Sequence, residues 1–293
     1  MTFNDDARIN PDKVSRRGRN TGIAVGGGGG LLALGLFIAS QFLGVDLTGL
    51  ASGGGATDGS QQPGETLAQC TTGEAANTDI DCRIAGAADS LDTYWADALP
   101  ALGQTYRTTD VVLFTGETDT GCGGATSASG PFYCPADELI YIDTAFYDDL
   151  RTRFGSSGGP LAEMYVVAHE WGHHIQNSTG IMEGLDRQGT GPASDSVRLE
   201  LQADCFAGSW VGAASEIRSE SGAPFLEPVT DAQIADALSA ASAVGDDRIQ
   251  QSQGGSVSPE SWTHGSSEAR QRWFTTGLNG GPDACNTFEV TNP

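Results

Sequence analysis

The chain has 293 residues, of which 38% are hydrophobic, and its formal net charge is −23. This length is enough for one sizeable domain with appendages. Five basic residues lie within the first twenty positions, so ten basic and thirty-five acidic residues remain in the body. An acidic body repels phosphate, and no stripe of Lys and Arg alternates with aromatic residues, which argues against nucleic acid as a partner.

The N-terminal region is predicted to contain a membrane anchor. Residues 1–20 are basic, and residues 21–44 (TGIAVGGGGGLLALGLFIASQFLG) carry no charge over a length near that of one transmembrane helix. A cleaved signal peptide is the alternative. The positive-inside rule then places residues 1–20 in the cytoplasm and the body outside the membrane, in a bacterial envelope. Residues 45–64 predict a flexible Gly/Ser-rich linker, and residues 65–293 the folded domain.

Within that domain, a helix is predicted over 84–102, where apolar residues recur at helical spacing. Strands are predicted at 110–116 and 139–143 from their β-branched and aromatic residues, with a Gly/Ser-rich loop between them. Helical patterns then dominate the rest of the chain, at 144–154, 160–176, 196–217, 231–242 and 266–277. The expected fold class is therefore α+β, a small β-sheet followed by a mostly helical half.

Six cysteines indicate an oxidising compartment, since none shows the CxxC spacing of a structural zinc site. Two pairs are close in sequence and a third is distant, which suggests disulfides Cys70–Cys82, Cys122–Cys134 and Cys205–Cys285. Six cysteines allow about fifteen pairings, so other connectivities stay open.

The motif HEWGH predicts a catalytic zinc site with one ion. His169 and His173 are four residues apart in an apolar helical run, so both imidazoles project from one helix face and could bind one metal ion. Glu170 lies about 100° around the helix from His169. It is therefore placed to act on zinc-bound water as the catalytic base rather than as a ligand.

A third ligand is expected from the later segment ELQAD. Glu200 lies 27 positions after His173, and Asp204 follows one helical turn later on the same face. One carboxylate could bind zinc while the other accepts a hydrogen bond from a ligand imidazole. The other candidates for the third ligand are Glu163, Asp186, Asp195 and His264.

Three further features bear on the site. The metzincin pattern would need Gly at 176 and His at 179, but this chain has Gln176 and Thr179. His174 lies about 100° from the metal face, so we expect it to pack or to form hydrogen bonds. His264 precedes the last helix and could fold back over the site to stabilise an oxyanion, or could be a surface histidine. Aromatic residues 262, 273 and 274 are expected to be core.

The combination VVAHEWGHHIQ, ELQADCFAGSW and THGSSEARQRWF behind an N-terminal anchor resembles the bacterial neutral zinc metallopeptidase family, which is similar to the gluzincin branch of zincins. The resemblance covers nearly the whole chain, including GPFYCPAD and IYID. It implies a zincin-like fold and zinc, with His169, His173 and Glu200 as ligands and Glu170 as base.

The expected activity is hydrolysis of peptide bonds in a protein or peptide substrate. Two alternatives stay open: a non-catalytic zinc-containing binding or scaffold module of the envelope, and a zinc amidase that acts on peptidoglycan. An intact base at Glu170 argues against the first, because a structural zinc site does not need that carboxylate.

Overall fold

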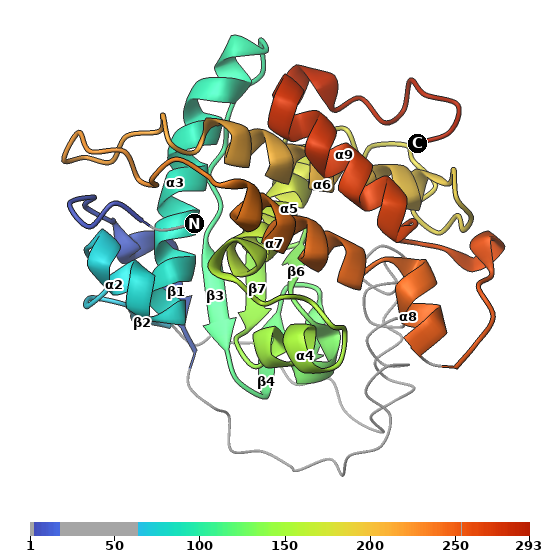
Figure 1. The fold of residues 1–293 in the computed structure, drawn as a ribbon, viewed down its shortest axis with the longest axis horizontal. Coiled ribbons are helices and arrows are strands. Elements are labelled where there is room, and N and C mark those ends of the chain that lie inside the picture. Colours follow the sequence, from blue (N-terminus) through green and yellow to red (C-terminus); the bar gives the residue numbers. More distant parts are fainter. Residues whose placement is uncertain (1–2, 18–63, 253) are drawn as a thin grey trace.

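The computed structural model describes residues 3–17, 64–252 and 254–293 (Figure 1). It confirms a mixed α+β fold in which strands come mainly from the first half of the chain and helices dominate the second. One large core contains most of the buried apolar side chains, and a smaller cluster lies on the other face of strands β3, β6 and β7.

Five strands form the main sheet, in the order β2-β1-β3-β7-β6. Their bounds are Glu65–Thr66 (β2), Val14–Arg16 (β1), Val111–Phe114 (β3), Leu139–Asp143 (β7) and Phe132–Cys134 (β6). The pairs β1–β3 and β3–β7 are parallel, and the two outer strands run antiparallel to their neighbours. Every residue of β3 is buried, as its run of apolar residues predicts for a central strand.

Three of the described helices pack against one central helix, Pro160–Ser178 (α5). The bounds of the described helices are Gly73–Thr78 (α2), Ile80–Ala101 (α3), Phe146–Thr152 (α4), Pro160–Ser178 (α5), Asp195–Ala213 (α6), Asp231–Ala243 (α7), Asp246–Ser252 (α8) and Ser267–Gly280 (α9). Helix α5 contacts α3, α6 and α7 and also strands β6 and β7, while α9 lies along α6 (Figure 1). The central helix therefore joins the sheet to the helical half.

Local signals explain where the central helix and its neighbour α3 begin. Pro160 occupies the first turn of α5, where its missing N–H costs nothing. Asp79 caps α3 by accepting a hydrogen bond from the backbone of Cys82 at 3.1 Å. The apolar face of α3 is buried as expected, with Trp95 edge-on to Phe206 of α6. Both predicted helices are thus confirmed, with ends shifted by a few residues.

The loop predicted between the two strands contains more structure than expected. Residues Glu117–Thr120 (β4) and Gly123–Thr126 (β5) form an antiparallel hairpin, and β6 follows. The sequence did not predict this hairpin because its residues are mostly polar or small and only two of its side chains are buried. The helix α2 and the short α8 were also not predicted.

The N-terminal boundary of the folded domain differs from the sequence prediction. The domain was expected to begin near residue 65, but β1 lies between β2 and β3 in the main sheet. Phe3, Ile9 and Val14 are all at most 2% exposed and belong to the large core. The sequence did not predict this strand because its three residues are mostly polar or basic. The strand is stabilised by pairing with β3, which lies far along the chain.

The predicted membrane span, residues 21–44, lies outside the described residues, as does the predicted linker up to residue 63. Among the helices that the structure describes, none combines the length and apolar character needed to cross a bilayer.

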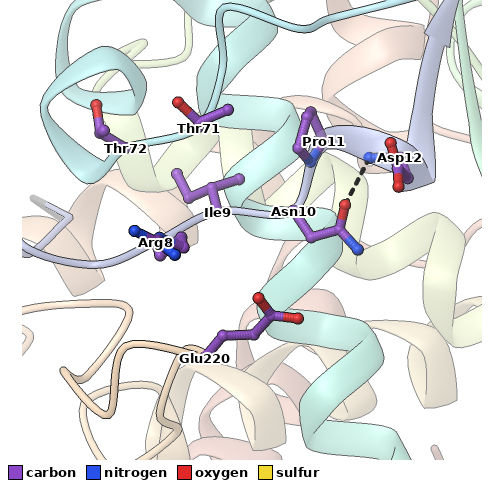
Figure 2. Close-up of a pocket in the computed structure, with 8 residues that line it drawn as sticks. All are labelled: Arg8, Ile9, Asn10, Pro11, Asp12, Thr71, Thr72 and Glu220. Carbon is purple, nitrogen blue, oxygen red and sulfur yellow. Dashed lines mark hydrogen bonds between the residues drawn. The ribbon is translucent and has the colours of Figure 1, made fainter.

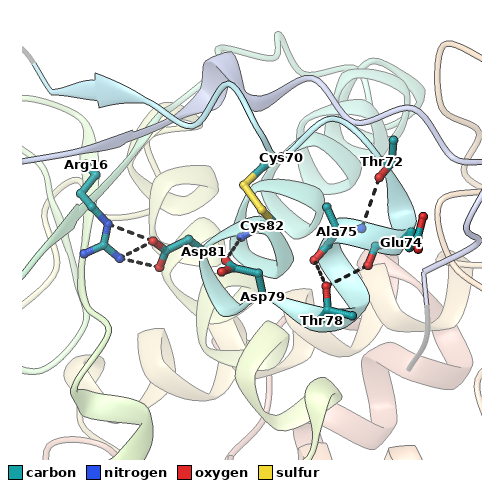
Figure 3. Close-up of a disulfide and its surroundings, with 9 residues drawn as sticks. All are labelled: Arg16, Cys70, Thr72, Glu74, Ala75, Thr78, Asp79, Asp81 and Cys82. Atoms are coloured by element: carbon teal, nitrogen blue, oxygen red, sulfur yellow. Dashed lines mark hydrogen bonds and ion pairs between the residues drawn. A yellow bond between two sulfur atoms is a disulfide. The ribbon is translucent and has the colours of Figure 1, made fainter.

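All three expected disulfides are confirmed: Cys70–Cys82, Cys122–Cys134 and Cys205–Cys285. The first joins the start of α3 to the segment that precedes α2 (Figure 3). The third joins α6 to the chain just after α9, across 80 positions of sequence. No described cysteine is free.

Candidate metal centre

Helix α5 presents the two histidines of HEWGH toward α6. His169 and His173 are one helical turn apart, their ring centroids lie 4.8 Å apart, and both side chains are buried. The carboxylate of Glu200 on α6 reaches both rings, with Oε2 at 3.2 Å from Nε2 of His169 and Oε1 at 3.4 Å from Nε2 of His173. The structure therefore brings the three predicted ligands together from two helices.

The spacing of these atoms fits a zinc ion. One ligand atom from each of the three residues lies within 4.8 Å of the others. Ligands around a tetrahedral zinc ion, with bonds of roughly 2.1 Å, stand about 3.4 Å apart. The two His–Glu distances, 3.2 and 3.4 Å to the two different oxygens of Glu200, lie near this value, and zinc accepts a donor set of two imidazoles and one carboxylate. The cluster could therefore hold such an ion with little rearrangement.

The other ring nitrogens are held by hydrogen bonds. His169 donates from Nδ1 to Oδ1 of Asp204 at 2.9 Å, and His173 donates from Nδ1 to Oε1 of Gln176 at 2.9 Å. Each bond leaves the Nε2 lone pair available for a metal and fixes the plane of the ring. Gln176 in turn donates to the backbone of Leu199 on α6 at 2.7 Å. The sequence predicted that Asp204 would accept a hydrogen bond from a ligand imidazole. It did not predict that Gln176 would do the same for His173.

Arg270 on α9 is a further residue of this site that sequence reasoning missed. Its Nε and Nη2 donate to the two oxygens of Asp204 at 2.7 and 3.0 Å, and Nη2 also donates to the hydroxyl of Tyr165 at 3.2 Å. Tyr165 donates to Asp204 as well. Arg270 is 2% exposed, so this is a buried, two-point ion pair behind a ligand histidine. In the sequence, the segment SSEARQRWF supports only the resemblance to the family and does not point to a role for Arg270.

Glycines set the close packing of the helices that carry these residues. A Cβ on Gly172, within HEWGH, would lie 2.9 Å from the Cα of Ala203, so this glycine lets α5 approach α6. A Cβ on Gly208 of α6 would lie 1.9 Å from the carbonyl oxygen of Phe274 on α9. These contacts place Glu200 opposite the histidines and Arg270 behind Asp204.

The charges of the cluster favour a bound cation. Burial by itself would lower the pKa of His169, but Asp204 and Glu200 raise it to about 10. Burial would likewise raise the pKa of Glu200, but His173 and His169 hold it well below its usual value. The same carboxylates that retain a proton on His169 would stabilise a metal ion bound in its place.

Glu170 lies beside the ligand cluster without joining it. Its side chain is 8% exposed, and burial raises its pKa, opposed by the two ligand histidines and by a hydrogen bond from the backbone of Tyr133. A carboxylate with a raised pKa is a better proton acceptor. Its electrostatic interactions with His169, His173 and Glu200 place Glu170 close to the cluster.

His264 approaches the cluster from the loop before α9. It interacts electrostatically with Glu200, and its side chain is 13% exposed. Asp246, the first residue of α8, accepts from Nδ1 of His264 at 3.2 Å and from the backbone N–H groups of residues 263, 264 and 265. Burial would lower the pKa of His264, but Asp246 raises it. Sequence spacing could not reveal Asp246, because it lies eighteen positions earlier on another helix.

The remaining candidates have other partners. His174 is fully buried and bonds to the hydroxyl of Tyr133 and the carbonyl of Arg107, as expected for a packing histidine. Glu163 pairs with Arg83 at 2.6 Å, and Asp195 accepts from the backbone of residue 186. Trp273 and Phe274 are core, and Trp262 packs against it.

A second group of potential ligands is found among the described residues: Cys70, Asp79 and Cys82. Its two sulfur atoms are bonded to each other, so they offer no thiolate to a metal (Figure 3). Asp79 is occupied as the cap of α3. The His–His–Glu cluster is thus the better metal site in the part of the chain that the structure describes.

Comparison with known proteins gives one family and several relatives. The family model described as "Putative neutral zinc metallopeptidase" matches residues 3–288. The "Uncharacterized protein Rv2575" of Mycobacterium tuberculosis is 50% identical over 232 residues, which is 78% of each chain. The "Uncharacterized protein YpfJ" of Escherichia coli (strain K12) is 40% identical over 270 residues, 89% of this chain and 87% of that protein. No solved structure matches the chain.

Proposed function

Since the chain belongs to the neutral zinc metallopeptidase family, we propose that it hydrolyses peptide bonds with one zinc ion held by His169, His173 and Glu200. The observation that carries the proposal is the group of three ligand atoms, one from each residue and all within 4.8 Å of one another, with the buried carboxylate of Glu170 next to it. Among the described residues, three protein ligands converge there, and catalytic zinc sites keep the fourth position for water or substrate.

Each residue then has a defined task. A zinc ion held by these three residues would supply Lewis acidity to activate water and to polarise the substrate carbonyl. Glu170 accepts the proton of the attacking water and returns it to the leaving amine. Asp204 orients His169 and is itself held by Arg270. Gln176 orients His173.

His264 is proposed to stabilise the oxyanion that develops during attack. Asp246 fixes the imidazole by accepting from Nδ1, which leaves Nε2 to donate a hydrogen bond when the ring is protonated. Asp246 raises the pKa of His264, which favours the protonated ring. A donor held in place before the reaction costs no reorganisation when charge develops.

The sheet offers a surface for a peptide substrate. Strand β6 is the outer strand of the main sheet, packs against α5, and brings the backbone of Tyr133 to Glu170. Extended peptides bind to outer strands by adding a strand of their own. A peptide substrate would fit such an outer strand beside Glu170.

The three disulfides support an extracytoplasmic location for the catalytic body, because such bonds persist in oxidising compartments. A peptidoglycan amidase would use the same water-activating residues, and a zinc-containing scaffold module would use only the ligands. The two alternatives therefore predict different results in one assay.

The test uses the full chain in detergent, with zinc per chain measured by elemental analysis and cleavage measured on a peptide library. We expect about one zinc per chain and cleavage that is lost in Glu170→Gln with zinc content unchanged. Glu183→Gln, at an exposed position, is the matched control. Bound zinc without cleavage of any peptide refutes the peptidase, and peptidoglycan fragments then separate an amidase from a scaffold module.

A further inference from the structure

The N-terminal segment, residues 3–17, is part of the catalytic body rather than an extension from it. Strand β1 pairs in parallel with β3 and antiparallel with β2, so it fills an interior place in the sheet. The last described residue of the segment, Arg17, donates its backbone N–H to Leu113 at 2.8 Å. Without this segment, β2 would have no partner in the described sheet.

The body has a surface shaped to receive the segment. A Cβ on Gly86 of α3 would lie 2.5 Å from the ring of Phe3, and a Cβ on Gly73 would lie 1.8 Å from the carbonyl oxygen of Asn4. Phe3 is 2% exposed. Two glycines thus leave room for backbone and ring of the segment, and larger residues would displace it.

Polar groups of the segment are also matched. Asn77 accepts from the N–H of Phe3 at 2.8 Å and donates to its carbonyl at 2.9 Å. The N–H of Asn10 donates to Asp89 on α3 at 2.8 Å. Arg16 forms a two-point ion pair with Asp81, with its Nε at 2.9 Å from Oδ2 (Figure 3). Contacts are therefore distributed along the whole segment.

Between Arg8 and Asp12 the segment bridges a cavity of about 630 Å³ (Figure 2). Thr71 and Thr72 line its opposite side, and Glu220 approaches from below. An isolated β-bridge between Arg8 and Thr72 closes the segment onto this wall. The segment therefore also contacts the rest of the domain next to this cavity.

From these contacts we infer that residues 3–17 and residues 65–293 occupy the same compartment. A segment cannot be an interior strand of a sheet that lies on the other side of a bilayer. This differs from the expectation of a cytoplasmic N-terminus, which followed from the positive charges alone.

The family model matches from residue 3 onward, so the segment lies within the region that the family shares. The inference concerns topology and holds whether or not the site cleaves peptides.

Cross-linking in cells tests the inference. Ser15 and Thr66 face each other across β1 and β2, and neither is fully buried. Directly opposite Cα atoms in such a ladder lie about 4.5 to 5.5 Å apart, within the range of a disulfide. In the full chain with Ser15→Cys and Thr66→Cys, oxidation of living cells by membrane-permeant diamide should link the two positions, as read by non-reduced peptide mapping after thiols are blocked.

The matched control pairs Ser15→Cys with Ser252→Cys, at the end of α8 on the other side of the molecule in Figure 1. It should not cross-link. The native disulfides in the same map report folding of the body. A linked dimer would mean that a second copy supplies the strand, which still puts both parts in one compartment.

Absence of the 15–66 link in a body with its three native disulfides would overturn the inference. A second measurement does not depend on added cysteines. Short epitopes are placed before Phe3 and after the exposed Gly254, and antibody binding is compared in intact and permeabilised spheroplasts. Antibodies should reach both epitopes under the same condition, either in intact or only in permeabilised spheroplasts. If the epitope before Phe3 alone is protected in intact spheroplasts, the inference is overturned.

Discussion

Replacement of Arg270 by Met tests whether the buried ion pair behind His169 supports the metal site. Met keeps much of the side-chain volume but removes both hydrogen bonds to Asp204. Asp204 is 0% exposed, so its charge would remain buried with only the His169 N–H and the Tyr165 hydroxyl as partners. Removal of one member of a buried ion pair costs about 3 to 5 kcal/mol.

The effect on zinc follows from the same contacts. Residues that orient a metal-binding imidazole change metal affinity by about 10- to 100-fold when lost. We therefore expect Arg270→Met to weaken zinc binding by a factor in that range, measured by competition with a chromophoric chelator. Arg270→Lys keeps the charge but not the planar pair of donors, and should fall between wild type and Met.

Arg272→Met is the control, because Arg272 lies on the same helix and is exposed. It should change the free energy of unfolding by less than about 0.5 kcal/mol. Unfolding in urea of the metal-free proteins separates lost stability from lost zinc affinity. The reasoning is refuted if Arg270→Met matches Arg272→Met in both measurements.

Three other predictions concern stability and catalysis. Burial raises the pKa of Asp89 to about 6 from 3.8, so folding favours its protonated form and stability falls as pH rises through about 6. Asp89→Asn keeps an acceptor for the N–H of Asn10, and should raise the free energy of unfolding by about 1 to 2 kcal/mol at pH 8 and little at pH 4. Equal urea midpoints at pH 8 would contradict this. Replacement of Cys205 and Cys285 by Ala opens a loop of 80 positions and should cost about 4 kcal/mol in the same urea assay, whereas a loss below 1 kcal/mol would count against it. Asp246→Asn removes the charge that orients His264 and should lower kcat by about 100-fold while zinc per chain stays the same. An unchanged kcat would exclude this role.

Much of the candidate site was predictable because its parts are local in sequence. His169 and His173 share a helix face by spacing alone, and so do Glu200 and Asp204. The apolar context of both segments predicts helices, and the structure places those helices as α5 and α6. Helical periodicity therefore determined which groups could meet within each segment.

The meeting of distant segments was decided by tertiary structure. Arg270 reaches Asp204 across 66 positions, and Asp246 reaches His264 from another helix. Gly172 allows the close approach of α5 to α6, although a glycine within a helix carries no such information by itself. These contacts depend on how helices pack, which no spacing rule within one segment encodes.

The N-terminal segment shows the same division most clearly. The composition shows that the segment is basic. From that charge alone, the sequence predicted that the segment lies apart from the folded domain of residues 65–293. Its strand has three residues, too few to form on their own, and becomes stable only when paired between β2 and β3. The sequence by itself thus determined the chemistry and the long helices, while the order of the sheet and the place of the N-terminus depended on pairing between residues far apart in the chain.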